Sequence, residues 1–369
     1  MSFLQLGISE DFNKGLKEIG IITPTQIQEQ SIPVLLEGVY DFIGRAQTGT
    51  GKTAAFGLPL LMNINAKKHQ TQGLILAPTR ELAQQIAKQL FKFTKYTDKI
   101  FVEAVYGGEK IERQIGRLQR TTHIVVATPG RLVDLIKRKA VDIRHIKTIV
   151  MDEADEMLSM GFKKELDFIL KTITDQRNVW LFSATMPKTL EAIVKTHISP
   201  NAVNVSIDKK DTVNTKIEHQ FVVGETGNKV DTMTYFLKTQ KNERGIIFTR
   251  TKVAARELTE QLKSRGFDVG ILEGDMQQKD RDKVMRAFKN FKLPLLIATD
   301  VAARGIDVNN LAFVLHYQLP DQPEYYVHRS GRTARGGKKG VSIAFLDHKE
   351  VKFLRVLEKQ VGVKFTQLR

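Results

Sequence analysis

The chain of 369 residues is 41% hydrophobic and 27% charged, a composition typical of a globular protein with room for two hydrophobic cores. It has no cysteine, no signal peptide and no apolar run of the roughly 20 residues that cross a bilayer, which excludes disulfides and thiolate metal sites and predicts a cytoplasmic protein without membrane contact. The net charge of +16 favours a polyanionic partner, although a basic surface can also serve solubility alone.

Short β-branched strand patterns alternate with amphipathic helical patterns along the whole chain. Helices are predicted, for example, over residues 81–96 and 253–265. The alternation predicts parallel α/β sheets, and a polar linker over residues 208–218 separates a first domain, 1–207, from a second, 219–369. The predicted strands are 73–77, 101–106, 123–127, 148–151, 179–182, 245–248, 269–272, 293–298, 312–316 and 341–345.

Many of these strands end in a polar or glycine-containing signature. The signatures are APTREL, ATPGR, MDEAD and FSAT in the first half, and FTRT, LEGD and ATDVAARGID in the second. Ligands of open α/β sheets bind at the carboxyl ends of the strands. Because the signatures recur in phase with the strands, we expect two functional edges.

The segment AQTGTGKT, residues 46–53, fits a phosphate-binding loop except that Ala46 replaces the first glycine. Gly49 and Gly51 allow backbone N–H groups to turn inward around an anion. Lys52 supplies charge to the β- and γ-phosphates, and Thr53 can ligate Mg²⁺. The other loop positions are Gln47, Thr48 and Thr50.

The strand at 148–151 leads directly into a cluster of acidic residues that begins with Asp152 and Glu153. Such a cluster needs either open water or a cation. Beside a phosphate loop, Asp152 is placed to hold Mg²⁺ through its water shell, and Glu153 to orient the attacking water and accept its proton. The alternative is a solvated acidic turn, which the cluster alone would favour.

Features that bind phosphate recur at the other strand ends of the first half. A helix N-terminus beside an arginine can clamp a backbone phosphate, and paired glycines let nucleic acid approach the protein backbone. None of these residues forms a base-reading pattern, so binding independent of base sequence is expected. The residues are Thr79, Arg80, Gly107, Gly108, Thr128, Pro129, Gly130 and Arg131.

The ordered motifs AQTGTGKT, PTREL, TPGR, DEAD, SAT, ARGID and HRSGRTAR resemble those of the DEAD-box RNA helicases of helicase superfamily two. The resemblance extends from residue 3 to about residue 365. It implies two tandem RecA-like domains, each a mainly parallel sheet with helices on both faces. It also implies ATP and Mg²⁺ as cofactors, ATP in the cleft between the domains, and RNA, single-stranded or in short duplexes, across both. The preference for RNA over DNA rests on this resemblance alone.

The resemblance extends the nucleotide site beyond the loop. It implies that Gln28 in GIITPTQIQ reads the adenine edge and that Phe3 is the isolated aromatic of the family. Taken alone, Gln28 could equally be a helix-surface residue. Where the family usually has Phe or Tyr this chain has Ile21, so aliphatic packing would replace base stacking.

Further roles are implied in the second half. Arg332 and Arg335 resemble arginine fingers, His328 the partner of Glu153 around the water, and Asp307 the ribose contact. Ser183 and Thr185 resemble the hydroxyl pair that links hydrolysis to domain closure, although both could instead cap the helix near Pro187. The RNA-side matches are Arg250, Gly274, Asp275, Gln278, Arg281, Thr299 and Arg304, of which Gln278 and Arg281 could be ordinary helix-surface residues.

These observations predict an ATP-dependent RNA helicase that binds the RNA backbone without sequence specificity and opens short duplexes locally. One alternative is an ATP-gated RNA clamp or remodelling scaffold with weak unwinding. Another is a DNA-directed helicase of the same superfamily. A small-molecule phosphotransferase is disfavoured by the motifs of the second half. The sequence identifies no protein partner, whether in RNA decay or in ribosome assembly.

Overall fold

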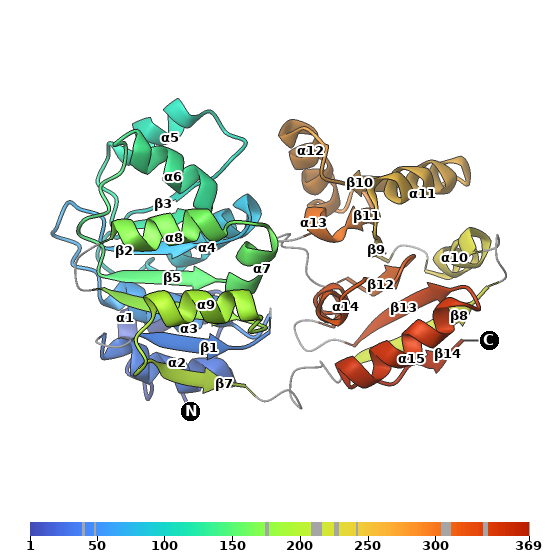
Figure 1. Cartoon of the computed structure of the whole chain (residues 1–369), viewed down its shortest axis with the longest axis horizontal. Coiled ribbons are helices and arrows are strands. Elements are labelled where there is room, and N and C mark those ends of the chain that lie inside the picture. The colour runs from blue at the N-terminus through green and yellow to red at the C-terminus, as the bar shows by residue number, and fades with distance from the viewer. Residues whose placement is uncertain are drawn as a thin grey trace. The chain divides into compact units, whose positions relative to one another are not determined.

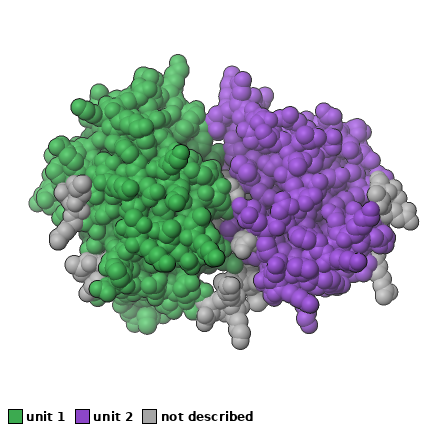
Figure 2. Space-filling model, in the orientation of Figure 1, with its two compact units in different colours: residues 1–208 green, residues 209–369 purple. Residues whose placement is uncertain are grey.

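The computed structural model describes residues 1–38, 41–47, 49–173, 177–207, 216–224, 229–240, 243–303, 311–334 and 339–368. The chain divides into two compact units, residues 1–208 (unit 1) and 209–369 (unit 2), which Figure 2 colours separately. The division falls within the polar stretch that the sequence assigns to a linker. Within the described ranges, no helix is long and apolar enough to cross a membrane.

Unit 1 is built on a sheet of parallel strands in the order β3-β4-β2-β5-β6-β1-β7 (Figure 1). Every residue of β2, β4 and β5 is buried, as expected for a parallel sheet that is covered on both faces. The strands are β1 Phe42–Arg45, β2 Gly73–Leu76, β3 Val102–Val105, β4 Ile124–Ala127, β5 Thr148–Asp152, β6 Asn178–Ser183 and β7 Val203–Ser206.

Helices cover both faces of this sheet, so the core of unit 1 has two layers. Successive strand residues point to opposite faces, which places Val150 in the cluster with Phe56 and Trp180, and Met151 in the cluster with Leu166. The helices are α1 Glu10–Glu18, α2 Gln26–Leu36, α3 Lys52–Met62, α4 Arg80–Phe93, α5 Ile111–Leu118, α6 Pro129–Lys137, α7 Ala154–Ser159, α8 Lys163–Thr172 and α9 Lys188–His197.

Unit 2 repeats the architecture with the strand order β10-β11-β9-β12-β13-β8-β14, parallel in each described pair (Figure 1). Its strands are β8 Ile217–Val223, β9 Gly245–Thr249, β10 Val269–Leu272, β11 Leu295–Thr299, β12 Phe313–His316, β13 Gly340–Leu346 and β14 Thr366–Gln367. Its helices are α10 Lys229–Thr239, α11 Lys252–Ser264, α12 Gln278–Lys289, α13 Asp300–Ala303, α14 Pro323–Ser330 and α15 Glu350–Val361. The predicted fold class, two tandem parallel α/β units, is confirmed.

Strands β1, β7, β8 and β14 are absent from the predicted set. β8 begins at Ile217, inside the range assigned to the linker, and its burial alternates between exposed Glu218 and buried His219. It therefore lacks the continuous apolar run that marks a central strand. β1 is only four residues long and includes Gly44, where a Cβ would approach the ring of Phe182 to 2.8 Å.

Candidate functional site

The loop between β1 and α3 has the conformation of an anion cradle. Gly49 and Gly51 have positive φ values of 85° and 91°, a region that residues with side chains avoid. The N–H of Ala46 donates to the carbonyl of Ser183 at 3.0 Å and ties the start of the loop to the end of β6. Because α3 begins at Lys52, the positive end of its dipole lies at the loop.

Lys52 is buried inside this loop, with 5% of its surface exposed. Its ammonium group donates to the carbonyl of Ala46 at 3.0 Å. The hydroxyl of Thr50 donates to the carbonyl of Gln47 at 2.7 Å and closes the loop further. Half-buried Thr53 follows on α3. A neutral carbonyl is a weak partner for a buried cation, so Lys52 can exchange it for a phosphate oxygen.

The amide of Gln28 links the N-terminal segment to this loop. Its Nε2 donates to the carbonyl of Gly51 at 2.9 Å, and its Oε1 accepts from the N–H of Thr25 at 2.9 Å. The hydroxyl of Thr25 donates to the carbonyl of Thr50 at 2.7 Å. A Cβ at Gly51 would collide with the Gln28 amide. The predicted adenine-reading residue thus contacts the loop, and its Nε2 keeps one N–H and its Oε1 one lone pair for another partner.

The two other residues predicted on the adenine side differ in burial. Phe3 is 1% exposed and belongs to the core of unit 1, so its ring is enclosed by protein. Ile21 is partly exposed and packs at the edge of the same core cluster. Of the two, Ile21 is the side chain with apolar surface that remains accessible.

The acidic segment begins at the last residue of β5. Asp152 is 3% exposed, and its Oδ1 accepts from the N–H of Glu153 at 3.0 Å. Glu153 has left-handed backbone angles, φ 52° and ψ 49°. A non-glycine residue in this region costs about 1–2 kcal/mol, and such strain is concentrated at functional sites. Burial raises the pKa of Asp152 to about 7, while the charge of Lys52 lowers it and that of Glu153 raises it further.

The donors at this position fit a magnesium ion that is held mostly by phosphate and water. Within the described ranges, no group of three or more His, Cys, Asp or Glu side chains could hold a metal. Asp152 is nevertheless a buried carboxylate whose ionised form is disfavoured, and a divalent cation would stabilise that form. Because Mg²⁺ is commonly bound by one or two carboxylates together with substrate phosphates, Asp152 and the hydroxyl of Thr53 fit it.

Ser183 is the last residue of β6, the neighbour of β5, and Thr185 follows the strand. The N–H and the hydroxyl of Thr185 both donate to Oδ2 of Asp155 at 2.8 Å, and the hydroxyl of Ser183 donates to the carbonyl of Thr185 at 2.7 Å. The alternative that these hydroxyls cap α9 is wrong, because the N-cap is Pro187 and makes no side-chain cap hydrogen bond. Asp155 had no role in the sequence analysis, since its partner becomes visible only from the strand order.

Two helices of unit 1 begin side by side at the ends of neighbouring strands β2 and β4. Thr79 is the N-cap of α4, and its hydroxyl accepts from the N–H of Leu82 at 3.3 Å. Thr128 is the N-cap of α6 and makes no side-chain cap hydrogen bond. Arg80 lies in the first turn of α4, and Pro129, Gly130 and Arg131 in the first turn of α6. The structure therefore brings together two of the predicted phosphate clamps.

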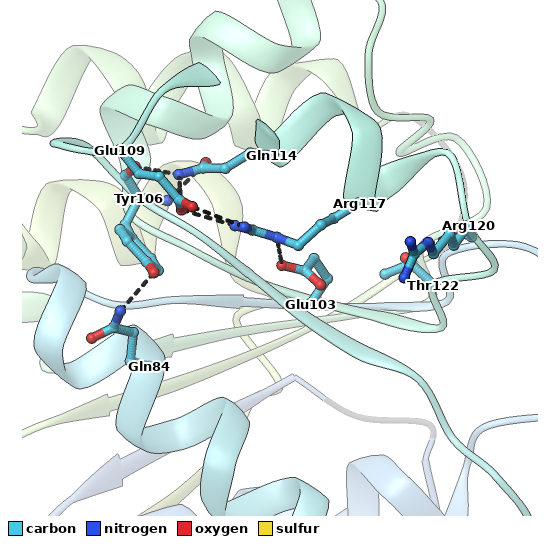
Figure 3. Close-up of polar contacts among 8 residues, drawn as sticks. All are labelled: Gln84, Glu103, Tyr106, Glu109, Gln114, Arg117, Arg120 and Thr122. Atoms are coloured by element: carbon cyan, nitrogen blue, oxygen red, sulfur yellow. Dashed lines mark hydrogen bonds and ion pairs between the residues drawn. The ribbon is translucent and has the colours of Figure 1, made fainter. Parts of the chain in front are cut away.

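The glycine pair lies beside these helix starts. Gly107 and Gly108 are exposed, and Gly108 has a φ of 83°. The guanidinium group of Arg80 lies 5.1 Å from the ring centroid of Tyr106, and Nη2 of Arg131 donates to the carbonyl of Glu109 at 3.0 Å. The residues that flank the turn, Tyr106 and Glu109, therefore contact Arg80 and Arg131. Figure 3 labels both flanking residues.

Several of the residues predicted to bind RNA in unit 2 have partners within that unit. Thr299 ends β11 and is 5% exposed. On α12, Gln278 donates to Asp282 at 2.8 Å and Arg281 donates to the carbonyl of Ala302 at 2.6 Å. These bonds are compatible with either a structural or an RNA-binding role.

Arg250, Gly274 and Asp275, the predicted residues that follow β9 and β10, are more exposed than these three. The Nη1 of Arg250 pairs with exposed Asp321 at 2.9 Å. Asp275 pairs with Lys252 at 2.5 Å and with Arg256 at 3.2 Å. A Cβ at Gly274 would meet no atom within 4 Å, so there is open space beside this backbone.

The segment HRSGRTAR begins on α14. His328 is partly exposed, with its ring 6.5 Å from that of Tyr325, and Arg332 follows the helix. Arg329 was not singled out in the sequence, yet it is 2% exposed and donates to both carboxylate oxygens of Asp300, at 2.5 and 2.6 Å. This pair anchors the helix that carries His328 to α13. The segment contains three arginines, and the sequence gives no sign of which is buried. Thr48, Arg304, Asp307 and Arg335 lie outside the described residues.

Known proteins match this chain along its length. Residues 25–193 match the DEAD/DEAH box helicase family, and residues 228–337 match the helicase conserved C-terminal domain. The ATP-dependent RNA helicase CshA of Limosilactobacillus reuteri is 43% identical over 370 residues, covering 100% of this chain and 74% of that protein. The protein of the same name from Listeria monocytogenes is 44% identical, covering 100% and 70%. The structure of S. cerevisiae Dbp5 bound to RNA and ADP BeF3 is 33% identical with a TM-score of 0.90, covering 100% of this chain and 95% of that chain.

Proposed function

This chain belongs to the DEAD-box ATP-dependent RNA helicases, and we propose that it grips the RNA backbone without sequence specificity and opens short duplexes locally as it hydrolyses ATP. The observation that carries the proposal is the loop with buried Lys52 together with the buried carboxylate of Asp152 at the end of β5. A phosphate cradle and a cation ligand are the two parts that phosphoryl transfer needs first. Because ATP and RNA are both supplied in the cytoplasm, we place the protein there.

The nucleotide binds with its phosphates in the loop of residues 46–53. Lys52 leaves the carbonyl of Ala46 for the β- and γ-phosphate oxygens, and backbone N–H groups at the start of α3 complete the cradle. The remaining N–H and lone pair of the Gln28 amide pair with the adenine edge, and Ile21 supplies an apolar surface. Since Gln28 also bonds to Gly51, base recognition and loop geometry share one side chain.

Hydrolysis follows from the strained end of β5. Asp152 and Thr53 would hold Mg²⁺, which would supply positive charge to the phosphate oxygens when bound. Glu153 accepts a proton from the attacking water while the water oxygen bonds to the γ-phosphorus and the bond to the β-phosphate oxygen breaks, giving ADP and phosphate. Because the backbone of Glu153 is left-handed, its side chain points in a different direction from the one it would take in a right-handed helical conformation.

Residues of unit 2 complete the reaction. Arg332 and Arg335 neutralise charge on the transferring group, His328 joins Glu153 around the water, and Asp307 contacts the ribose. Because the phosphate loop lies in unit 1 and these residues in unit 2, we propose that rapid hydrolysis requires both units.

RNA binds through its phosphates at the strand ends of both units. In unit 1 the helix starts at Thr79 and Thr128, with Arg80 and Arg131, supply N–H groups and charge. In unit 2 the contacts come from Arg250, Gly274, Asp275, Gln278, Arg281, Thr299 and Arg304. The hydrogen bonds between Thr185 and Asp155 connect the acidic segment to the end of β6, which gives the coupling role of Ser183 and Thr185 a physical route.

The test is to measure ATP turnover and strand displacement side by side on a short RNA duplex and on the matched DNA duplex. The expected result is turnover stimulated by RNA and displacement that needs ATP. Lys52→Ala should abolish both, whereas Lys68→Ala, at an exposed position, should leave both unchanged. If the protein retains RNA in the presence of ATP but does not displace the strand, it is an RNA clamp and not a helicase. Equal stimulation by DNA would contradict the RNA preference.

A further inference from the structure

Behind the glycine turn of unit 1 lies a polar network that no assigned role uses. It consists of Glu103, Tyr106, Glu109, Gln114 and Arg117, on β3, on the turn and on α5 (Figure 3). Gln114 is 0% exposed, although it lies on a short surface helix. A fully buried amide is costly unless its hydrogen bonds are made, so the network must be satisfied internally.

Gln114 holds the entry to the turn. Its Oε1 accepts from the N–H of Tyr106 at 3.2 Å, and its Nε2 donates to the carbonyl of Tyr106 at 2.9 Å. The same Nε2 donates to a carboxylate oxygen of Glu109 at 3.0 Å. One side chain therefore fixes the backbone before Gly107 and the side chain after Gly108.

Arg117 binds Glu109, the residue that follows the turn. Its Nη1 and Nη2 donate to the two carboxylate oxygens of Glu109, both at 2.9 Å, and its Nε donates to Glu103 at 2.6 Å. Hydrogen bonds from Arg117 lower the pKa of Glu109 from 4.5 to about 2, so this carboxylate is ionised at neutral pH. A bidentate pair of this kind fixes orientation as well as distance.

The residues that flank the glycine turn also contact Arg80 and Arg131, the two arginines proposed to bind RNA. The carbonyl of Glu109 accepts from Arg131, and the ring of Tyr106, whose hydroxyl accepts from Gln84 at 2.6 Å, lies beneath the guanidinium group of Arg80. A displacement of the turn would move the partners of both arginines.

We propose that Gln114 and Arg117 are positioning residues for RNA binding: they fix the Gly107 and Gly108 turn, and with it Arg80 and Arg131, without touching RNA themselves. The inference rests on the proposed function, since it assumes that this edge of unit 1 binds RNA.

The experiment compares full-length variants for RNA affinity, by fluorescence anisotropy with a labelled single strand and a non-hydrolysable ATP analogue. Gln114→Ala changes no charge, and Arg117→Ala removes one. Each should weaken RNA binding by about five- to tenfold, the scale of one or two lost hydrogen bonds, and leave the affinity for nucleotide unchanged. Arg117→Lys, which keeps the charge but not the bidentate geometry, should fall between Arg117→Ala and the unchanged chain.

The matched control is Arg144→Ala. Arg144 also forms an ion pair, with Asp142 at 2.8 Å, but it lies before β5, at the opposite end of the parallel strands. Removing it changes the net charge as Arg117→Ala does, yet RNA affinity should not change. Thermal unfolding of each variant establishes that it is folded, and Arg117→Lys remains informative if Arg117→Ala is not.

The salt dependence separates positioning from direct contact. A positioning residue leaves the slope of log Kd against log salt unchanged, whereas loss of a direct phosphate contact reduces the slope by about one. A reduced slope for Arg117→Ala would overturn its positioning role. Wild-type affinity in folded Gln114→Ala would overturn the inference while leaving the proposed function intact. Absence of RNA binding by the unchanged chain would overturn both.

Discussion

At the scale of single residues, the site depends on side chains whose burial or backbone geometry is unfavourable without a ligand. Lys52 is a buried cation held by a carbonyl, and Asp152 is a buried carboxylate with a raised pKa. Glu153 sits in a left-handed conformation. The sequence predicted roles for all three, from the loop pattern and from the acidic cluster that follows a strand, but the strain at Glu153 could not be predicted, because backbone angles of a non-glycine residue depend on how β5 joins α7.

Glu153→Gln separates binding from chemistry. The substitution keeps the shape of the side chain and the strained backbone but removes the proposed base, so turnover should fall by orders of magnitude while ATP and RNA still bind. The measurement is RNA-stimulated turnover beside nucleotide and RNA affinity. Glu112→Gln, at an exposed position on α5, is the control. A loss of ATP affinity as large as the loss of turnover would argue against the assigned role.

At the scale of elements, the sequence predicted most central strands and the helices over residues 81–96 and 253–265, observed as α4 and α11. Central strands are continuous apolar runs, and these helices are long and periodic. The missed strands are either short, as β1, β7 and β14 are, or interrupted by exposed residues, as β8 is by Glu218. The network around Gln114 was equally invisible, because a glutamine on a short helix has no sequence signal of burial.

Strand β8 carries a pH-sensitive residue. His219 is buried, its Nδ1 lies 2.6 Å from the hydroxyl of Tyr326, and its ring lies 5.8 Å from that of Phe365. Burial lowers the pKa of His219 from 6.5 to about 4. The unfolded chain therefore binds a proton more readily than the folded chain in this window, so stability present above pH 6.5 is lost as the pH falls toward 4.

His219→Phe should flatten the pH dependence of the unfolding temperature between pH 6.5 and about 5, because phenylalanine keeps the ring contacts but cannot be protonated. Some dependence will remain, since burial also lowers the pKa of His316. Thermal unfolding at several pH values measures the slope. His145→Phe, at an exposed position, should leave it unchanged. An identical slope in wild type and His219→Phe would exclude His219 as a source.

At the scale of the whole molecule, the proposed catalytic residues are divided between two units that fold around separate sheets. Fragment 1–207 should therefore bind nucleotide but show little RNA-stimulated turnover, because it lacks His328, Arg332 and Arg335. Arg335→Ala in the full chain should behave similarly, whereas Arg355→Ala, on α15, should not. Turnover of the fragment equal to that of the full chain would rule out the need for both units.

The net charge of +16 and the phosphate-directed contacts predict how RNA affinity responds to salt. Binding that releases counterions from several phosphates should weaken by at least about tenfold between about 50 and about 200 mM salt, with little dependence on base sequence. Anisotropy titrations of several single strands at both salt concentrations give the result. A strong preference for one sequence at both concentrations would contradict backbone recognition.

The left-handed backbone at position 153 favours glycine for stability, whereas the proposed reaction needs glutamate there. Glycine adopts this conformation without the steric penalty of a Cβ, so Glu153→Gly should raise the stability of the full chain by up to about 1 kcal/mol, measurable as a higher unfolding temperature, while removing the proposed base. If Glu153 is that base, selection for thermal tolerance alone would favour an inactive protein at this position. Selection for turnover would then be what keeps a residue here that the fold itself disfavours.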